Sequence, residues 1–198
     1  MPYRRCTRSD KELHVKKFER VEELVDWLTT SGVDTTAWDK GTSKSVANLW
    51  DEYVQGELIF QISPPLRIVE VVQILIRRSG LFLLEMEQEF VNGRRRSREL
   101  PPSEKIKPGE NCVEAAYRCL HEELGLNRNQ ISIIEPGTSK RDREVDSLSY
   151  PGLYTRYTIH DVHAEVRGLP DGDFWRENVA TKDGDPIRRH LWAWRKRP

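Results

Sequence analysis

One stretch near the middle of the chain places acidic and basic side chains at spacings that could do chemistry. Glu122 and Glu123 are adjacent, and Arg118 stands four residues before Glu122. On a helix each residue turns by about 100°, so Cys119 shares one arc with Glu122 and Glu123. Adjacent carboxylates repel each other, and a divalent cation or a nearby base relieves that repulsion. Carboxylate oxygens suit Mg²⁺ or Mn²⁺, and an arginine can clamp a carboxylate through two hydrogen bonds. The stretch therefore indicates a helix face that could hold a hard metal ion.

The same stretch resembles the Nudix box, G-x5-E-x7-R-E-U-x-E-E-x-G-U, in which U is a bulky aliphatic residue. The matching residues stand at the required spacing and are Glu110, Arg118, Leu120, Glu122, Glu123, Gly125 and Leu126. Lys105 matches the lysine that often follows the first Gly of the box. Two positions differ: Glu104 replaces that first Gly, and Cys119 replaces the Glu that follows the Arg. The resemblance extends more weakly over residues 66–195 and does not cover the segment before them.

This resemblance implies a fold and a reaction. Nudix proteins are αβα sandwiches with a mixed β-sheet, and they hydrolyse a nucleoside diphosphate linked to a second group, with Mg²⁺ or Mn²⁺ as cofactor. Carried over by position, Glu122 and Glu123 would coordinate the metal, and Glu123 would also help to deprotonate the attacking water. Arg118 and Glu110 would orient the carboxylates. The implied partner is a small-molecule diphosphate substrate or nucleotide, whose identity does not follow from the box.

Cys119 leaves two functions open. In the family a metal-binding carboxylate stands at this position, and a thiol is a poor ligand for Mg²⁺. The chain is therefore either a Mg²⁺-dependent hydrolase or a Nudix-fold binding or regulatory module that has lost turnover. A carboxylate from another loop could complete the metal shell, and the candidates by composition are Glu135, Asp142, Glu144, Asp146 and Glu165.

The element that must carry the box is a predicted helix over residues 113–124. Asn111 and Glu114 form an N-x-x-E capping pair, and Gly125 stands where a left-handed residue ends a helix. Strands are predicted over residues 66–76, 81–90, 94–98, 131–135, 154–166 and 187–195, with a charged loop over 139–147. Asn92-Gly93 is a strong hairpin signal between the second and third of these strands.

The second of these strands alternates, which predicts that Glu85, Glu87 and Glu89 lie on its half-exposed face. The arginines of residues 94–98 could lie opposite these acidic residues. A phosphate-contacting patch is the alternative for the arginines.

Two amphipathic helices are predicted before the box domain, over residues 21–28 and 46–53. Ser43 or Ser45 could cap the second helix. We expect a helical N-terminal extension over residues 1–60 and a Nudix-like domain over 61–198. Because short isolated helices are marginal in water, the extension should pack on the domain. The residues expected to do so are Leu28, Leu49, Trp50 and Tyr53. A protein partner or a second copy could also bind these helices.

Composition sets the remaining expectations. The 198 residues include 32 Lys and Arg and 32 Asp and Glu, so the net charge is zero, which argues against a general nucleic-acid binder. No apolar run reaches the length of a membrane span. Three cysteines are too few for a disulfide framework, and Cys112 and Cys119 are expected as small semi-buried thiols. We expect a cytoplasmic protein, with an organelle after removal of a transit peptide as the alternative.

Overall fold

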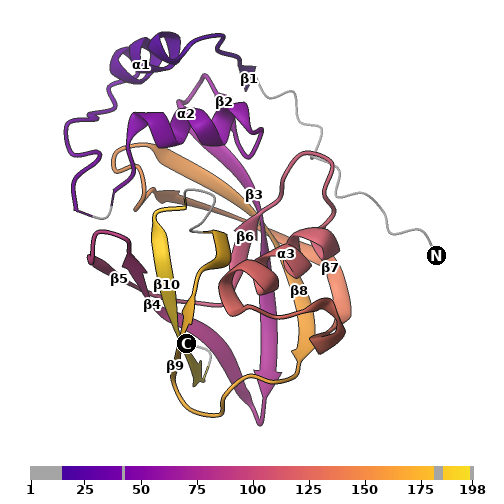
Figure 1. Ribbon diagram of the computed structural model, residues 1–198. Helices are drawn as coiled ribbons and strands as arrows, with labels where there is room; N and C mark the ends of the chain where they lie inside the picture. The colour runs from indigo at the N-terminus through magenta and orange to yellow at the C-terminus, as the bar shows by residue number, and fades with distance from the viewer. Residues whose placement is uncertain (1–14, 42, 181–184, 197–198) are drawn as a thin grey trace. The chain divides into compact units, whose positions relative to one another are not determined.

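The computed structural model describes residues 15–41, 43–180 and 185–196 (Figure 1). It has an α/β fold with a large antiparallel sheet and few helices, so the predicted fold class is confirmed. The chain divides into two compact units, which we describe separately. The first comprises Met1–Glu70, Lys105–Asn111 and Arg141–Ile159, and the second comprises Val71–Glu104, Cys112–Lys140 and His160–Pro198.

The first unit contains both N-terminal helices. Its elements in chain order are β1 (Val15–Lys16), α1 (Val21–Thr30), α2 (Val46–Val54) and β2 (Ile59–Gln61). β2 pairs antiparallel with β1 and with the start of β3 (Leu66–Arg78). The unit is held by fully buried leucines and by an aromatic cluster in which Phe60 stacks with Trp27 at 5.1 Å and with Tyr53 at 5.7 Å between ring centroids. Leu28 and Leu49 are fully buried in this unit, as amphipathic helices require.

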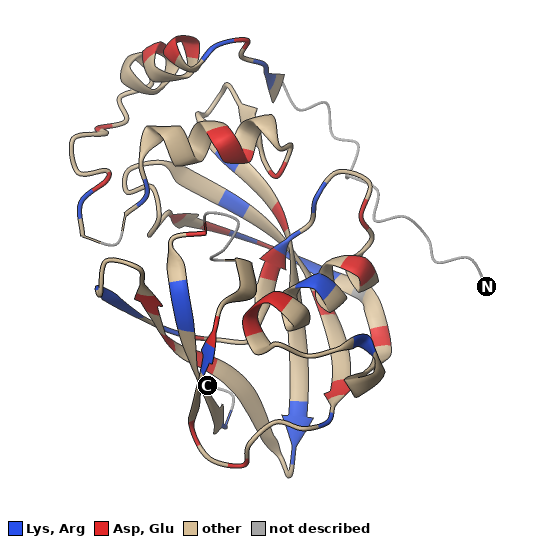
Figure 2. Cartoon of the chain, viewed as in Figure 1, with Lys and Arg blue, Asp and Glu red and all other residues tan. Residues whose placement is uncertain are grey.

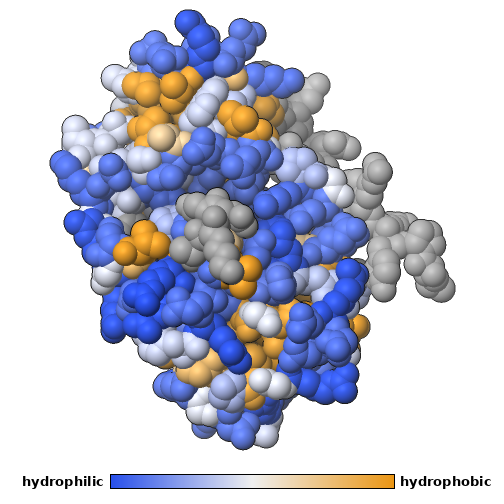
Figure 3. Space-filling view, in the orientation of Figure 1, coloured by the Kyte–Doolittle hydropathy of each residue, from blue (hydrophilic) through white to orange (hydrophobic). Residues whose placement is uncertain are grey.

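Two details of these helices follow from their sequences. Ser45 is the N-cap of α2, because its hydroxyl accepts a hydrogen bond from the backbone N–H of Asn48 at 3.1 Å. This settles the choice between Ser43 and Ser45. Apolar side chains also remain visible over α1 (Figure 3), where Val25 is 40% exposed.

The second unit is built on antiparallel strands. β4 (Leu81–Phe90) pairs with β5 (Arg95–Leu100) on one side and with β10 (Ile187–Arg195) on the other. β10 pairs in turn with β9 (Phe174–Glu177), and the end of β3 pairs with β4. The box helix is α3 (Cys112–Leu124), which carries charges of both signs (Figure 2). The remaining elements are β6 (Ser103–Lys105), a 3₁₀ helix (Arg128–Gln130), β7 (Ile131–Asp146) and β8 (Tyr154–Val166).

Two sequence-based expectations are wrong. The charged segment 139–147 is not a loop, because β7 continues through it to Asp146 and pairs with β8. The predicted half-exposed acidic face of β4 is wrong for two of its three carboxylates, since Glu85 is 2% exposed and Glu89 is 5% exposed, whereas Glu87 is partly exposed. Both carboxylates are buried because arginines from neighbouring strands neutralise them. Arg98 lies 3.0 Å from Glu85, and Arg95 and Arg189 lie 3.0 and 2.8 Å from Glu89. Pairing of the arginines with the acidic strand is thereby confirmed.

Candidate functional site

α3 ends where the sequence predicts. Gly125 has a φ of +66°, which glycine adopts without steric cost. Its N–H donates to the carbonyl of His121 at 3.0 Å, and the N–H of Leu126 donates to the carbonyl of Leu120 at 3.2 Å. These bonds satisfy carbonyls that the end of a helix would otherwise leave unpaired. One face of α3 buries Ala115, Ala116 and Leu120. The charged residues of the box lie on the rest of the helix surface.

Cys119 and Glu123 form an interacting pair on α3. They lie one helical turn apart, and the Cys119 side chain is fully buried and interacts with the Glu123 carboxyl group. Oε2 of Glu123 is enclosed and has no hydrogen-bond partner among the described residues. Burial raises the pKa of Glu123 well above its usual range, and the nearby carboxylates of Glu85 and Glu104 raise it further. Burial likewise raises the pKa of the Cys119 thiol, so Cys119 is a thiol and not a thiolate.

Arg118 lies between two carboxylates. Its Nη1 is 3.5 Å from Oε2 of Glu104 and 3.6 Å from Oε2 of Glu122. The side chains of Glu104 and Glu122 are 25% and 24% exposed. The predicted pairing of Arg118 with Glu122 is therefore present, whereas Glu122 and Glu123 differ, because one is partly exposed and the other has an enclosed oxygen.

Glu85 belongs to the same group of charges, although it comes from β4. Its carboxylate contacts Arg98 on β5 and Nδ1 of His190 on β10. Burial alone would raise the pKa of Glu85, but Arg98 and His190 hold it below its usual range. The positive charge of Arg98 also lowers the pKa of Glu123, against the effects of burial and of the neighbouring carboxylates. Glu85 and Glu123 thus lie in one electrostatic network with opposite shifts, as carboxyl pairs in acid–base sites do.

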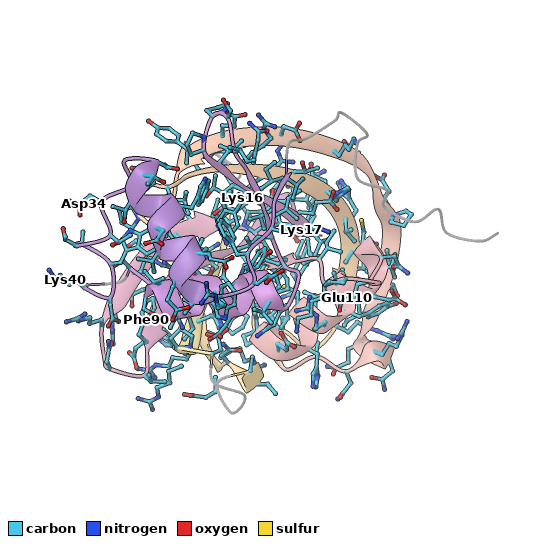
Figure 4. All side chains as sticks on the ribbon, turned by 90° about the horizontal axis from the view of Figure 1, so that it is seen from above. Lys16, Lys17, Asp34, Lys40, Phe90 and Glu110 are labelled. Carbon is cyan, nitrogen blue, oxygen red and sulfur yellow. The ribbon has the colours of Figure 1, made fainter. Side chains whose placement is uncertain are left out.

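Glu110 lies in the loop before α3 and is labelled in Figure 4. It belongs to the first unit, where its Oε2 accepts a hydrogen bond from the backbone N–H of Lys107 at 2.9 Å. Arg118, Glu122 and Glu123 belong to the second unit. The structure therefore places Arg118, Glu122 and Glu123 together on α3.

Sequence reasoning missed two residues of this site. The carboxylates that act on Glu123 are Glu85 and Glu104, and neither was among the five candidates for an additional ligand. Most of those candidates have partners elsewhere, since Asp142 accepts from Thr158, Glu144 pairs with Arg156 and Asp146 accepts from Gly152. Glu104 could have been found from its place in the box motif, where a carboxylate replaces a glycine. Glu85 gave no local signal, because it looked like one of three equivalent acidic residues.

The cysteines also differ from expectation. Cys112 is disulfide-bonded, whereas Cys119 is free and buried. The third cysteine, Cys6, lies outside the described residues. The prediction that Cys112 is a free thiol is wrong. None of the described helices is long and apolar enough to cross a membrane.

The donor chemistry of the site fits a hard divalent cation. Carboxylate oxygens are the preferred ligands of such ions, and the enclosed Oε2 of Glu123 is an acceptor without a donor among the described residues. Over the same part of the chain, no three or more His, Cys, Asp or Glu side chains are gathered into a group that could hold a metal by itself. A cation here would therefore depend on few protein ligands. Mg²⁺ commonly binds in this way, with water and substrate phosphate completing its shell.

Comparison with known proteins identifies a family for this chain. No curated protein sequence matches the chain. Among solved structures, a NUDIX hydrolase from Nitrosomonas europaea is 18% identical, with coverage of 63% of this chain and 70% of that chain and a TM-score of 0.37. An Ap4A hydrolase from C. elegans is 16% identical, with coverage of 63% and 77% and a TM-score of 0.36. Similarity at this level carries no argument about substrate.

The family model is more informative than these structures. The model of the NUDIX domain matches residues 67–181, which is more than half of the chain and includes the whole box segment. The match agrees with the spacing of Arg118, Glu122 and Glu123 on α3 and with the α/β fold around them. The chain therefore belongs to the NUDIX domain family.

Proposed function

We propose that this protein hydrolyses a diphosphate linkage in a nucleoside diphosphate-linked or related small molecule, with Mg²⁺ or Mn²⁺ as cofactor. The observation that carries the proposal is the enclosed Oε2 of Glu123, which has no hydrogen-bond partner among the described residues and is acted on by the carboxylates of Glu85 and Glu104. Ionisation of Glu123 in such a place is costly unless a cation compensates the charge. The family match supports hydrolysis as the class of reaction.

Each residue of the site has a proposed role that follows from its surroundings. Glu123 and Glu122 would hold the metal, which when bound polarises the diphosphate and makes water a better nucleophile. Glu123 would accept a proton from that water, because its raised pKa makes it a better base than an ordinary carboxylate. Arg118 orients Glu122 through their contact at 3.6 Å. Arg98 and His190 keep Glu85 ionised, so this carboxylate does not compete for the proton.

The test is a panel of nucleoside diphosphate-linked compounds, assayed with Mg²⁺ and with Mn²⁺ for release of phosphate or mononucleotide. Glu123→Gln should lower kcat by about 10²-fold or more, as loss of a general base does. Glu114→Gln is the matched control, because Glu114 is exposed on the same helix and the amide keeps its hydrogen-bonding capacity. Equal rates in Glu123→Gln and wild type would refute the assignment.

One observation favours a second function. Cys119 is fully buried at the position where the family has a metal-binding carboxylate. Its neutral thiol is a poor ligand for a hard cation. A Nudix-fold module that binds its diphosphate ligand without cleaving it would show this pattern. Saturable binding of a nucleoside diphosphate compound, without product formation under either metal, would select this function over hydrolysis.

A further inference from the structure

The end of α2 contacts the loop that carries the first half of the box. Nζ of Lys105 lies 2.8 Å from Oε1 of Glu52 and 2.8 Å from Oε2 of Glu57. Glu52 lies within α2, and Glu57 follows its C-terminal end. All three residues belong to the first unit. The lysine of the box is therefore held by two carboxylates from a segment that precedes the family match at residues 67–181.

Glu52 is not an ordinary surface carboxylate. It is 7% exposed and also pairs with Arg67 at 2.7 Å and with Lys44 at 2.9 Å. Burial alone would raise the pKa of Glu52, but the three cations hold it far below its usual range. Buried ion pairs of this kind often add little to stability, because desolvation offsets their attraction, and their best-attested use is to fix one arrangement.

Close packing joins the same two segments independently of charge. Gly56 has a φ of +72°, and a Cβ atom built on it would lie 2.5 Å from Cγ of Pro108. A Cβ atom does not fit at that distance, so the backbone at Gly56 packs directly against the ring of Pro108. Gly56 is thus required by both its conformation and its neighbour.

The loop is also fixed at its remaining positions. The N–H of Ile106 donates to the carbonyl of Glu70 at 2.9 Å, and Glu110 closes back on the N–H of Lys107. The loop then leads directly into α3 at Cys112. The position of Glu110, and the point at which the box helix begins, depend on a loop whose other end is held by α2.

We propose that Glu52, Gly56 and Glu57, at the end of α2, are positioning residues for the box segment of residues 105–111. The proposal rests on the function proposed above, because the loop carries the box residues Lys105 and Glu110. The N-terminal segment is then required for turnover as well as for packing. The positioning residues act through the loop and do not touch the substrate.

The first experiment needs no substrate. Hydrogen–deuterium exchange of the peptide covering residues 105–111 is measured in full-length wild type, Glu57→Gln, Gly56→Ala and Lys105→Met. Asp51→Asn is the matched control, because Asp51 is an exposed acidic residue of the same helix. We expect faster exchange in the first three variants and wild-type exchange in the control. Unchanged exchange in Glu57→Gln and Lys105→Met would overturn the proposal.

The second experiment measures function with the diphosphate panel. We expect kcat to fall by about 10²-fold in Glu57→Gln, as for a misplaced catalytic group, while the thermal midpoint stays close to that of wild type. Adding Glu57→Gln to Lys105→Met should cost nothing further, because Lys105→Met has already removed the contact with Glu57, and Lys105→Arg should retain most of the rate. Faster loop exchange with unchanged kcat would also overturn the proposal. A wild type without turnover would refute the hydrolase function instead, and the exchange measurement would still decide whether α2 positions the loop.

Discussion

At the scale of single residues, the site contains two carboxyl groups whose pKa values are shifted in opposite directions. Arg98 and His190 stabilise the ionised form of Glu85, while burial and neighbouring carboxylates favour the protonated form of Glu123. A raised pKa in the folded state means that Glu123 keeps its proton when no cation is present. A metal that binds through this oxygen must displace the proton, so binding and proton release are coupled.

This coupling predicts how metal affinity depends on pH. Below the raised pKa of Glu123, the affinity for Mn²⁺ should rise by about tenfold per pH unit, since one proton leaves for each ion bound. Titration calorimetry at several pH values, in buffers of different ionisation enthalpy, measures both the affinity and the protons released. Glu123→Gln should remove the pH dependence and Glu114→Gln should retain it. A flat pH profile in wild type would show that Glu123 is not a ligand.

A second prediction concerns Cys119. Cys119→Glu places another carboxyl group beside Glu123 at a fully buried position. Without metal the variant should lose on the order of 3 kcal/mol of stability, because a buried charge lacks a counterion. With saturating Mn²⁺ the new oxygen ligand should recover much of this loss and raise turnover. Thermal unfolding with and without Mn²⁺ measures the effect, and Cys119→Ser is the control of similar size. A midpoint that Mn²⁺ does not raise would contradict the idea that Cys119 replaces a ligand.

At the scale of elements, α3 owes its exact length to its last turn. Gly125 ends the helix in the left-handed region, and its N–H donates to the carbonyl of His121, in the turn that follows Arg118. A Cβ atom at Gly125 would meet nothing within 4 Å. The requirement for glycine at this position is therefore conformational and not steric.

Gly125→Ala should accordingly destabilise the protein by about 1 kcal/mol, the cost of a left-handed conformation for an ordinary residue. Gly125→Asn should cost less, because asparagine adopts this region more readily. Urea denaturation of the three proteins gives the free energies of unfolding. Equal losses for Ala and Asn would indicate that something other than backbone conformation matters at the end of α3.

At the scale of the whole molecule, each unit contains a buried charge network. The network of the first unit joins α2, β3 and the box loop through Glu52, Arg67 and Lys105. That of the second joins β4, β5 and β10 through Glu85, Arg98 and His190. Removing one member of such a network leaves the others unpaired in a buried place, which commonly costs about 3–5 kcal/mol.

The first network predicts part of the acid stability. The pKa of Glu52 is lower in the folded than in the unfolded state. Its contribution to the free energy of unfolding is therefore complete above its ordinary pKa of 4.5, and this contribution is lost as the pH falls toward the pKa of the folded state. Stability measured by urea denaturation should therefore decline below about pH 4.5. Glu52→Gln should be less stable at pH 7 and should show a shallower acid decline, whereas Asp51→Asn should follow wild type. An unchanged acid decline in Glu52→Gln would show that other carboxylates account for it.

The sequence by itself determined the local features of this protein. The three helices, the Asn92-Gly93 hairpin, the Ser45 cap and the glycine after the box helix follow from residue periodicity and from backbone preferences, which act over a few neighbouring positions. The spacing of the box follows for the same reason, because Arg118, Glu122 and Glu123 lie on consecutive turns of one helix.

Only the tertiary structure decided which charged residues are buried and what they face. Glu85, Glu87 and Glu89 are equivalent in an alternating strand, yet Glu85 joins the site, because it also contacts His190 of β10, which is distant in sequence. The same holds for Glu52, whose burial depends on cations from three separate segments. A carboxylate can leave water only where such partners converge, and their convergence is a property of the folded chain.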